Sequence, residues 1–371
     1  MANPSAGIIG LPNVGKSTLF NALTEAGAQV AKFPFSTVSP NVGIVLVPDP
    51  RLERLAELLN PEIATPASVE FIDVAGLVRG AHQGEGLGNE FLSRIRSVNL
   101  LVEVLRCFEG KEIAHPEGSI DPIRDAEIIE LELLLSDLKV VQRRLTKLDK
   151  LVKSGVKGNR ERFDLLQRVK TILEKGSFLR TVCTEKEAKE LAGEGFLTLK
   201  PLLYGANIDE NDLTSPSFSL KSLREYASQK GLELIEMCVQ FEAELAGVSA
   251  QEKAEFLKEL KMEEGLNKLI REVYEQLNLI TFFTISGGRE VRAWSVKKGT
   301  AAPQAAGGVH SDMQKGFVRA EVVSVSDLLE VGSMKRAKEQ GKVKIEGKDY
   351  KVEDGDVIYF RFTPLERKSR A

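Results

Sequence analysis

Cysteine is scarce in this chain of 371 residues, which contains only Cys107, Cys183 and Cys238. Three widely spaced thiols fit neither a disulfide framework nor a zinc site, so we expect a reducing compartment. Long apolar runs are also missing, because no stretch approaches eighteen consecutive apolar residues, and the first residues show no signal segment. We therefore expect a cytoplasmic protein without a membrane anchor.

A strong excess of one charge is lacking as well. The formal net charge of −3 predicts no general attraction to nucleic acid, so such a partner would need a local basic patch. With 42% hydrophobic residues, the chain is long enough to form two or three globular domains.

A phosphate-binding loop lies near the start of the chain. Residues 10–17 read G-L-P-N-V-G-K-S and match the pattern G-x-x-x-x-G-K-[ST], between an expected strand at 6–10 and an expected helix at 18–25. Glycines allow backbone N–H groups to surround phosphates at a helix N-terminus. We expect Lys16 to reach the β- and γ-phosphates and Ser17 to ligate Mg²⁺. The expected nucleotide contacts in this loop are Asn13, Val14, Gly15, Lys16, Ser17 and Thr18.

Two further segments supply candidates for Mg²⁺ binding and for sensing the γ-phosphate. The apolar run V-E-F-I-D-V-A-G-L ends in D-x-x-G, so Asp73 can hold the Mg²⁺ shell and Gly76 can contact the γ-phosphate. Upstream, Thr37 is a candidate second hydroxyl ligand, with an ordinary turn residue as the alternative. The glycine-rich residues 77–90 are typical of a switch loop.

The residue after D-x-x-G is Leu77, where Ras-like enzymes place a glutamine that orients the attacking water. An aliphatic side chain cannot orient water, so either hydrolysis is slow or another group performs this task. His82 and His115 are the candidate imidazoles, with an ordinary surface or core histidine as the alternative for each.

Residues 121–175 predict an antiparallel helical hairpin. Apolar residues recur at spacings of three and four, a heptad pattern, and S-G-V-K-G at 154–158 separates them from a second helical stretch at 159–175. The residues of the first seam are Leu131, Leu134, Leu138, Val141, Leu145, Leu148 and Val152.

The charge of this hairpin is uneven. Residues 139–180 contain thirteen lysines and arginines against four acidic residues, a balance of +9 that leaves −12 for the rest of the chain. A basic arm on an acidic protein indicates binding to a phosphate backbone, and we expect structured RNA; the alternative is a solvated helix face.

Strand character returns at 196–207 and 232–239, which places the hairpin inside one α/β domain. From 279 to 363 the pattern changes to short strands, with turns expected at Gly287-Gly288 and Gly307-Gly308, and this predicts a small mixed β domain.

Four segments of the chain are distinctive: G-L-P-N-V-G-K-S-T-L-F-N-A-L-T, P-N-V-G-I-V-x-V-P-D-P-R-L, D-V-A-G-L-V-x-G-A and R-C-F-E. Together they resemble the YchF family of Obg-like ATPases, and the resemblance extends over nearly the whole chain. The resemblance implies an α/β protein with a Ras-like P-loop G domain, an inserted antiparallel coiled-coil hairpin and a C-terminal β-grasp (TGS) domain. The matching boundaries are 1–120 with 196–278 for the G domain, 121–195 for the hairpin, 279–364 for the TGS domain and 365–371 for a tail.

The resemblance also bears on the choice of base. Family members carry Asn-x-x-Glu in place of the Asn-Lys-x-Asp of guanine-binding proteins, and they prefer ATP while often accepting GTP; the matching residues are Asn207, Ile208 and Glu210. An aspartate grips the guanine N1–H and N2 amine, which adenine lacks, whereas Asn207 could meet N7 of either purine. The family places Ile208 against the base. In the alternative, Glu210 is only a solvated residue at a helix start and Asp209 binds guanine.

For hydrolysis, the resemblance favours His115 over His82, because related members have a histidine at the position of His115. Leu77 matches the hydrophobic residue that the family carries in place of glutamine. In related GTPases with P-N-x-G-K-S loops, the asparagine helps to hold a potassium ion, so Asn13 is a candidate K⁺ ligand, with a turn-stabilising asparagine as the alternative.

These observations predict a Mg²⁺-dependent P-loop ATPase that prefers ATP to GTP and acts as a molecular switch. Its expected partner is the ribosome or ribosomal RNA, bound through the basic hairpin and the TGS domain. The alternatives are a nucleotide-stabilised RNA-binding or stress-signalling adaptor with incidental hydrolysis, and a GTPase proper.

Overall fold

The computed structural model describes residues 4–28, 41–74, 94–110, 113–153, 159–245 and 264–364 and the single residues 92, 248 and 252. The chain forms two compact units. The first unit comprises Ser5–Gly43 and Phe71–Leu269, and the second comprises Met1–Pro4, Ile44–Glu70 and Ile270–Ala371. The domain boundaries predicted from the sequence stay a prediction.

One six-stranded sheet has the order β2-β4-β1-β5-β6-β7. Within it, β1 pairs with β5, β5 with β6 and β6 with β7, and all three pairs are parallel. Its strands are β1 (Ser5–Ile9), β2 (Val42–Leu46), β4 (Ser68–Asp73), β5 (Leu100–Arg106), β6 (Leu202–Asn207) and β7 (Leu234–Met237). Every residue of β1, β5 and β6 is buried, as expected of parallel strands covered on both faces.

The strand predicted at 196–207 begins only at Leu202. The N–H of Lys200 donates to the carbonyl of Leu197 at 3.2 Å and closes a turn, which delays the strand. Helix α1 (Lys16–Ala28) begins earlier than predicted, directly after the loop glycine Gly15. The other helices around this sheet are α8 (Glu210–Thr214), α9 (Phe218–Lys230), α10 (Val239–Leu245) and α12 (Gly265–Gln276).

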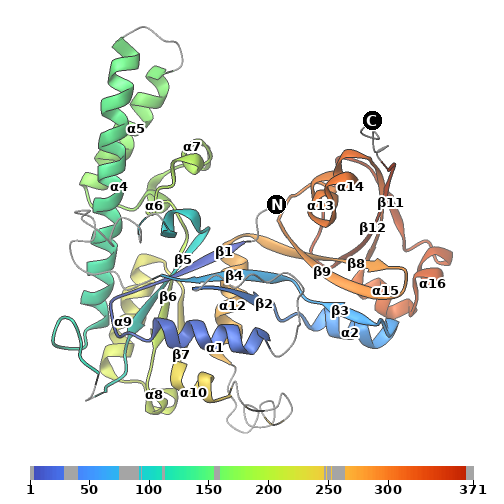
Figure 1. Cartoon of the computed structure of the whole chain (residues 1–371), viewed down its shortest axis with the longest axis horizontal. Helices are drawn as coiled ribbons and strands as arrows, with labels where there is room; N and C mark the ends of the chain where they lie inside the picture. The colour runs from blue at the N-terminus through green and yellow to red at the C-terminus, as the bar shows by residue number, and fades with distance from the viewer. Residues whose placement is uncertain are drawn as a thin grey trace, which may run out of the picture. The chain divides into compact units, whose positions relative to one another are not determined.

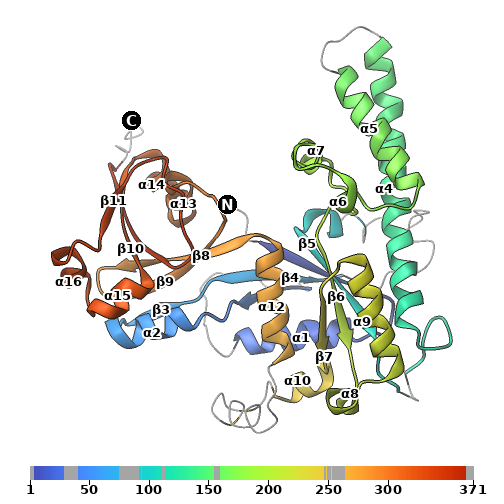
Figure 2. The same ribbon diagram turned by 180° about the vertical axis from the view of Figure 1, so that it is seen from behind.

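A helical hairpin lies between β5 and β6 in the chain, as predicted. Helices α4 (Pro122–Lys153) and α5 (Asn159–Glu174) run side by side in both views (Figures 1 and 2). At 32 residues, α4 is about 48 Å long. The chain returns to the sheet through α6 (Leu179–Val182), α7 (Glu185–Leu191) and the 3₁₀ turn η2 (Ala192–Glu194).

The middle of the predicted heptad seam, from Leu134 to Leu148, forms the core of this hairpin. Val141 of α4 is buried against Leu166 and Val169 of α5, and the neighbouring seam residues of α4 pack on the same cluster. Leu131, the first predicted seam residue, is instead 54% exposed. Helix α5 ends at Glu174, before it reaches the turn of α4 that carries Leu131, so α5 cannot cover this side chain.

A second, mixed sheet has the order β11-β10-β12-β8-β9-β3, which confirms the fold class predicted for the end of the chain. Strands β8 and β9 form an antiparallel hairpin, and β12 runs parallel to β8. The strands are β3 (Ile63–Thr65), β8 (Leu279–Ser286), β9 (Glu290–Lys297), β10 (Phe317–Ser324), β11 (Lys344–Glu346) and β12 (Asp356–Phe362). The helices of this unit are α2 (Pro50–Leu59), α13 (Ala302–Val309), α14 (Ser311–Lys315), α15 (Val325–Val331) and α16 (Met334–Glu339).

One of the two glycine pairs predicted as turns in this unit is not a turn. Gly287-Gly288 does join β8 to β9, and both residues have positive φ values of 57° and 74°. Gly307-Gly308 lies inside helix α13. A Cβ on Gly307 would come within 2.3 Å of Oε1 of Gln314, so this glycine serves the close approach of two helices.

The short strand β3 extends the second sheet by parallel pairing with β9. Next to it in the chain, Arg51 of α2 binds Asp354 at 2.6 Å, within the same unit. Among the described residues, no helix is both long and apolar enough to cross a lipid bilayer.

Candidate nucleotide-binding site

The phosphate loop has a backbone that only glycine can adopt at two positions. Gly10 and Gly15 have φ values of 146° and 99°. A Cβ on Gly10 would lie 2.6 Å from the carbonyl oxygen of Val104, and one on Gly15 would lie 2.3 Å from Nδ2 of Asn207. Because α1 begins at Lys16, its free N–H groups and positive dipole end face the loop. The loop is therefore shaped to surround a phosphate.

Lys16 lies inside this loop and is 7% exposed. Its Nζ donates to the carbonyl oxygen of Leu11 at 2.6 Å. Burial lowers the pKa of Lys16 to about 8, although the nearby Asp73 carboxylate acts in the opposite direction. A partly desolvated ammonium held at the loop is well suited to bind phosphate oxygens.

Ser17 and Asp73 meet beside the loop, as the sequence predicts. The hydroxyl of Ser17 donates to Oδ2 of Asp73 at 2.9 Å, and Oδ1 of Asp73 is buried without a hydrogen-bond partner among the described residues. A hydroxyl next to a carboxylate oxygen that has no partner fits Mg²⁺, which prefers oxygen ligands and commonly takes one or two from protein and others from phosphate and water. The other predicted residues of this region, Thr37, Gly76, Leu77 and His82, lie outside the described residues.

Asn207 ties the base-recognition segment to the phosphate loop. Its Nδ2 donates to the carbonyl oxygen of Val14 at 3.0 Å, and its Oδ1 accepts from the N–H of Val239 at 3.2 Å. The side chain is 5% exposed. The oxygen and the nitrogen of the Asn207 amide are therefore both hydrogen-bonded to the protein backbone. One hydrogen on Nδ2 remains available to a base.

The next three residues differ in their roles. Ile208 is 3% exposed, and Asp209 caps α8 by accepting from the backbone N–H of Asn211 at 3.0 Å. Glu210 is the exposed first residue of α8. They border a cavity of about 520 Å³ next to the loop, which we call the base cavity. This cavity is lined by Asn13, Gly15, Thr18, Phe108, Glu109, Gly110, Ile113, Asn207, Ile208, Asp209, Glu210, Asn211, Cys238, Val239 and Gln240.

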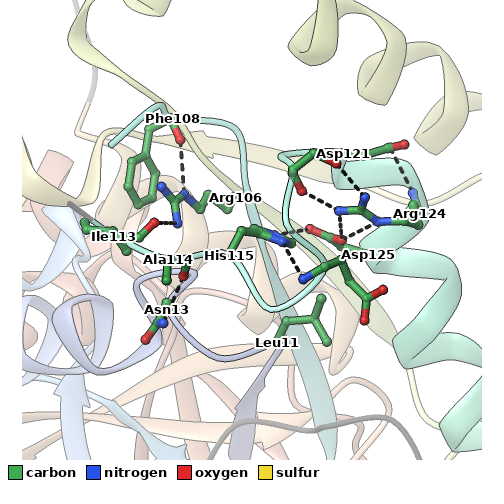
Figure 3. A network of polar contacts seen from close by, with 12 residues as sticks. Leu11, Asn13, Arg106, Phe108, Ile113, Ala114, His115, Asp121, Arg124 and Asp125 are labelled. Atoms are coloured by element: carbon green, nitrogen blue, oxygen red, sulfur yellow. Dashed lines mark hydrogen bonds and ion pairs between the residues drawn. The ribbon is translucent and has the colours of Figure 1, made fainter. Parts of the chain in front are cut away.

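His115 lies in a network of polar contacts next to the phosphate loop (Figure 3). Its Nε2 lies 2.8 Å from Oδ2 of Asp125 in the first turn of α4, and its Nδ1 accepts from the N–H of Glu117 at 3.1 Å. These contacts indicate a neutral imidazole that carries its proton on Nε2. The side chain is 4% exposed, so neither nitrogen is free to hold a water in this conformation.

Asn13 connects the phosphate loop to the same network. Its Nδ2 donates to the carbonyl oxygen of Ala114, the residue before His115, at 3.0 Å. The chain from Asn13 through Ala114 and His115 to Asp125 thus joins the loop to the start of α4 (Figure 3).

Arg106, at the end of β5, was not singled out from the sequence and organises the segment that carries these residues. The guanidinium donates to the carbonyl oxygens of Phe108 and Ile113 at 3.2 and 3.0 Å, and it lies over the Phe108 ring at 4.5 Å. It is 1% exposed. The signal in the sequence was an arginine at the end of a mostly apolar strand, whose other charged residue is Glu103.

The strand order, the glycine-dependent phosphate loop and the adjacent hydroxyl–carboxylate pair define a P-loop nucleotide-binding protein with a Ras-like G domain. Residues 5–141 match the family described as 50S ribosome-binding GTPase, and residues 279–363 match YchF-GTPase_C, described as a protein of unknown function (DUF933). The chain belongs to the YchF family, as the following relatives show.

The protein named "Ribosome-binding ATPase YchF" from Bacillus subtilis is 49% identical over 362 residues, which cover 96% of this chain and 99% of that protein. The protein of the same name from Escherichia coli O157:H7 is 46% identical over 96% of this chain and 98% of its own length. The solved structure of the YchF GTPase of Schizosaccharomyces pombe has a TM-score of 0.88 and 36% identity, and it covers 97% of this chain and 98% of its own.

Proposed function

We propose that this chain is a Mg²⁺-dependent P-loop ATPase that prefers ATP to GTP and changes its contacts with the ribosome according to the bound nucleotide. The observation that supports this proposal most directly is that Lys16, Ser17 and Asp73 lie together at the phosphate loop. The direct test compares hydrolysis of ATP and GTP in Mg²⁺ and in EDTA. Equal turnover in EDTA would overturn the role of the metal.

Ser17 and Asp73 would hold the Mg²⁺, together with Thr37 as predicted from the sequence. When bound, Mg²⁺ neutralises charge that develops on the β- and γ-phosphate oxygens. The protein's own contribution is to hold the phosphates with backbone N–H groups and Lys16 and to keep the Asp73 carboxylate oriented through Ser17.

The preference for ATP is supported by what the residues after Asn207 do. Oδ1 of Asp209 is occupied by the cap of α8, so Asp209 cannot bind guanine with both carboxylate oxygens while it keeps this cap, and Glu210 is exposed beside the cavity. The buried Ile208 lies where guanine-binding proteins carry lysine, and it offers the base an apolar contact.

The double variant Ile208→Lys with Glu210→Asp is expected to shift the ratio of ATP to GTP affinity at least tenfold toward GTP. The reason is that two charge-assisted hydrogen bonds to guanine are worth about 1.5 to 3 kcal/mol each. Calorimetric titration with both nucleotides measures the shift, and Asp212→Asn on the same helix is the control. An unchanged ratio would show that the base is chosen elsewhere.

We further propose that His115 positions the attacking water. Its contact with Asp125 must open for this, because both ring nitrogens are engaged. This requirement would couple hydrolysis to α4 and hence to the hairpin.

The variant His115→Ala is expected to lower the turnover of ATP about 100-fold with little change in ATP affinity, since such a group acts mainly in the transition state. The isosteric variant Asp125→Asn distinguishes two roles of His115, positioning of the attacking water and anchoring of α4. If His115 acts on water once released, Asp125→Asn retains native turnover or raises it. If His115 serves only to anchor α4, the two variants lose activity together. Single-turnover rates and ATP dissociation constants make the comparison.

Asn13 is the proposed K⁺ ligand. Its Nδ2 is committed to Ala114, while its Oδ1 has no hydrogen-bond partner among the described residues. A potassium ion at this oxygen would stabilise charge on the γ-phosphate. Turnover is therefore expected to be faster in potassium than in sodium, and Asn13→Ala should remove the difference. Equal native rates in the two salts would reject K⁺.

Binding to the ribosome is proposed from the relatives' name and from two basic surfaces. On α4, Arg143, Lys147 and Lys150 are exposed and have no ion-pair partner among the described residues. Many other basic residues of the hairpin are paired: Arg144 and Arg162 bind Glu194, and Arg168 binds Glu187 at 2.9 Å. The basic residues without ion-pair partners thus occupy a smaller part of the hairpin than the net charge of +9 counted along residues 139–180 indicates.

The second basic surface is on the paired strands β10 and β12. Arg319 and Arg361 lie opposite each other, and the Arg361 guanidinium lies 4.2 Å from the centre of the Tyr359 ring. Hydrogen bonds from Arg361 and Lys338 lower the pKa of Glu321 to about 2, so this single carboxylate faces several cations. Basic groups next to an exposed aromatic ring suit a nucleic acid.

The second candidate function is an adaptor that binds RNA in its nucleotide-bound form, with hydrolysis incidental. The occupied ring nitrogens of His115 favour it, because no other water-positioning group is visible among the described residues. Single-turnover hydrolysis with and without ribosomes distinguishes the two. A switch is accelerated by ribosomes, and an adaptor is not.

A further inference from the structure

A second cavity, of about 400 Å³, lies beside the first half of α4 and shares no lining residue with the base cavity. Its walls come from α4, from residues 176–181 with α6, and from the end of α9. The exposed Leu131, which the hairpin seam leaves uncovered, forms part of the wall with Leu134.

Arg180 supplies the unusual feature of this cavity. Its guanidinium lies over the Phe178 ring at 4.2 Å, and its Nε and Nη1 are buried without hydrogen-bond partners among the described residues. Burial lowers the pKa of Arg180, although Glu130 acts in the opposite direction. Buried N–H groups without acceptors are rare and destabilising, more so when charged, so they call for an explanation.

The nearby carboxyl groups do not supply the acceptors. Glu130 accepts from the hydroxyl of Tyr204 at 2.6 Å and from Nζ of Lys230. Glu103 is fully buried, and neither of its oxygens has a hydrogen-bond partner among the described residues. Burial raises the pKa of Glu103 well above its usual range, whereas the nearby Arg180 and Lys230 act in the opposite direction. Among the described residues, no hydrogen bond joins Glu103 to the Arg180 guanidinium.

We propose that this cavity binds a small organic oxyanion, a phosphate monoester or a carboxylate, through Arg180, with the apolar part of the ligand against Leu131, Leu134 and Phe178. A guanidinium presents N–H groups in a planar fork that matches both kinds of oxyanion. The volume lies in the range of small-molecule sites. The ligand would touch α4, α6 and α9 together, and so fix the start of the hairpin. This inference does not depend on the proposed function of the nucleotide site.

The test uses the full chain with saturating ADP and Mg²⁺, so that the phosphate loop is filled. Phenyl phosphate, benzoate and inorganic phosphate are titrated by calorimetry. The affinities for phenyl phosphate and benzoate show whether the cavity prefers a phosphate or a carboxylate. Comparison of phenyl phosphate with inorganic phosphate shows whether the apolar ring contributes to the affinity. Arg180→Met is expected to weaken binding of the preferred probe about 10- to 100-fold, the loss of one charge-assisted hydrogen bond. Arg143→Met, the same change on the exposed face of α4, should leave it unchanged.

Thermal unfolding without probe gives the second readout. If Arg180 serves a ligand, Arg180→Met has an unchanged or higher Tm, because an uncompensated buried charge is removed. A lower Tm with no probe binding to the native chain would identify Arg180 as an internal counter-ion of Glu103 and Glu130, and would overturn the proposal. Failure of all three probes to bind at millimolar concentration would also overturn it, as would equal loss in Arg143→Met.

Discussion

Substitution of Asp73 by asparagine is expected to lower the rate of ATP hydrolysis about 100- to 1000-fold, because a metal ion on the phosphates contributes several kcal/mol to transition-state stabilisation. Asp73 ends β4 with one carboxylate oxygen on the Ser17 hydroxyl and the other buried without a partner. An uncharged amide keeps the shape but loses the anionic ligand. The rate should therefore recover only in part at raised Mg²⁺.

Loss of activity through unfolding is separable from this effect. The buried Oδ1 of Asp73 has no partner to lose, so the Tm of Asp73→Asn without nucleotide should not fall. Asp164→Asn, at an exposed position of α5, is the matched control and should hydrolyse ATP at the native rate. Native turnover in Asp73→Asn would contradict the assignment of Asp73 as a metal ligand.

Reversal of Arg143, Lys147 and Lys150 to glutamate is expected to abolish co-sedimentation with ribosomes at physiological salt. These side chains are exposed on α4 and are not engaged by acidic residues among the described parts of the chain. Each cation that neutralises a phosphate contributes nearly one unit to the slope of log affinity against log salt. At physiological salt, loss of three such contacts corresponds to about a hundredfold in affinity, and repulsion by the new carboxylates adds to this loss.

Two controls make this test specific. Lys147→Arg with Lys150→Arg keeps the charge and should keep binding, and ATP affinity should be native in the reversal variant, because none of the three residues lines the base cavity. Binding of the native chain should weaken steeply as salt is raised. Ribosome binding that survives the reversal, or that is insensitive to salt, would move the interface to another surface such as β10 and β12.

The contiguous parts of the nucleotide site were predictable because their chemistry is local. Gly10 and Gly15 are needed for positive φ values within a loop of eight residues, and Lys16 and Ser17 follow at the helix start that the loop itself creates. The pairing of Ser17 with Asp73 could also be expected, because D-x-x-G at the end of an apolar strand is a separate recognisable pattern.

Partners that lie far apart in the chain could not be predicted in the same way. Asn207 was predicted at the base, which stays a prediction, but nothing in the sequence indicates that its amide also donates to the carbonyl of Val14, 193 residues away. Whether His115 is free or engaged depends on the path of the segment that Arg106 fixes, and the sequence shows no period or spacing for that path.

The net positive charge of the hairpin is another property that the sequence predicts only in part. Counted along the chain, residues 139–180 are strongly positive, but Glu187 and Glu194 fold back onto Arg168, Arg144 and Arg162. Arg180 belongs to a cavity and not to the arm surface. A count along the sequence cannot separate these groups, because charge is neutralised by neighbours in space.

By itself, the sequence of this protein determined the phosphate loop, the heptad seam of the hairpin and the order of α/β and mixed β parts, since glycine geometry and periodic burial act over a few residues. The tertiary structure alone decided that Leu131 lies beyond the reach of α5, that Gly307 serves helix packing, and that His115 is held by Asp125. Each of these depends on where a second segment ends or turns in space. That position results from the packing of the whole core and from no local preference of the residue concerned.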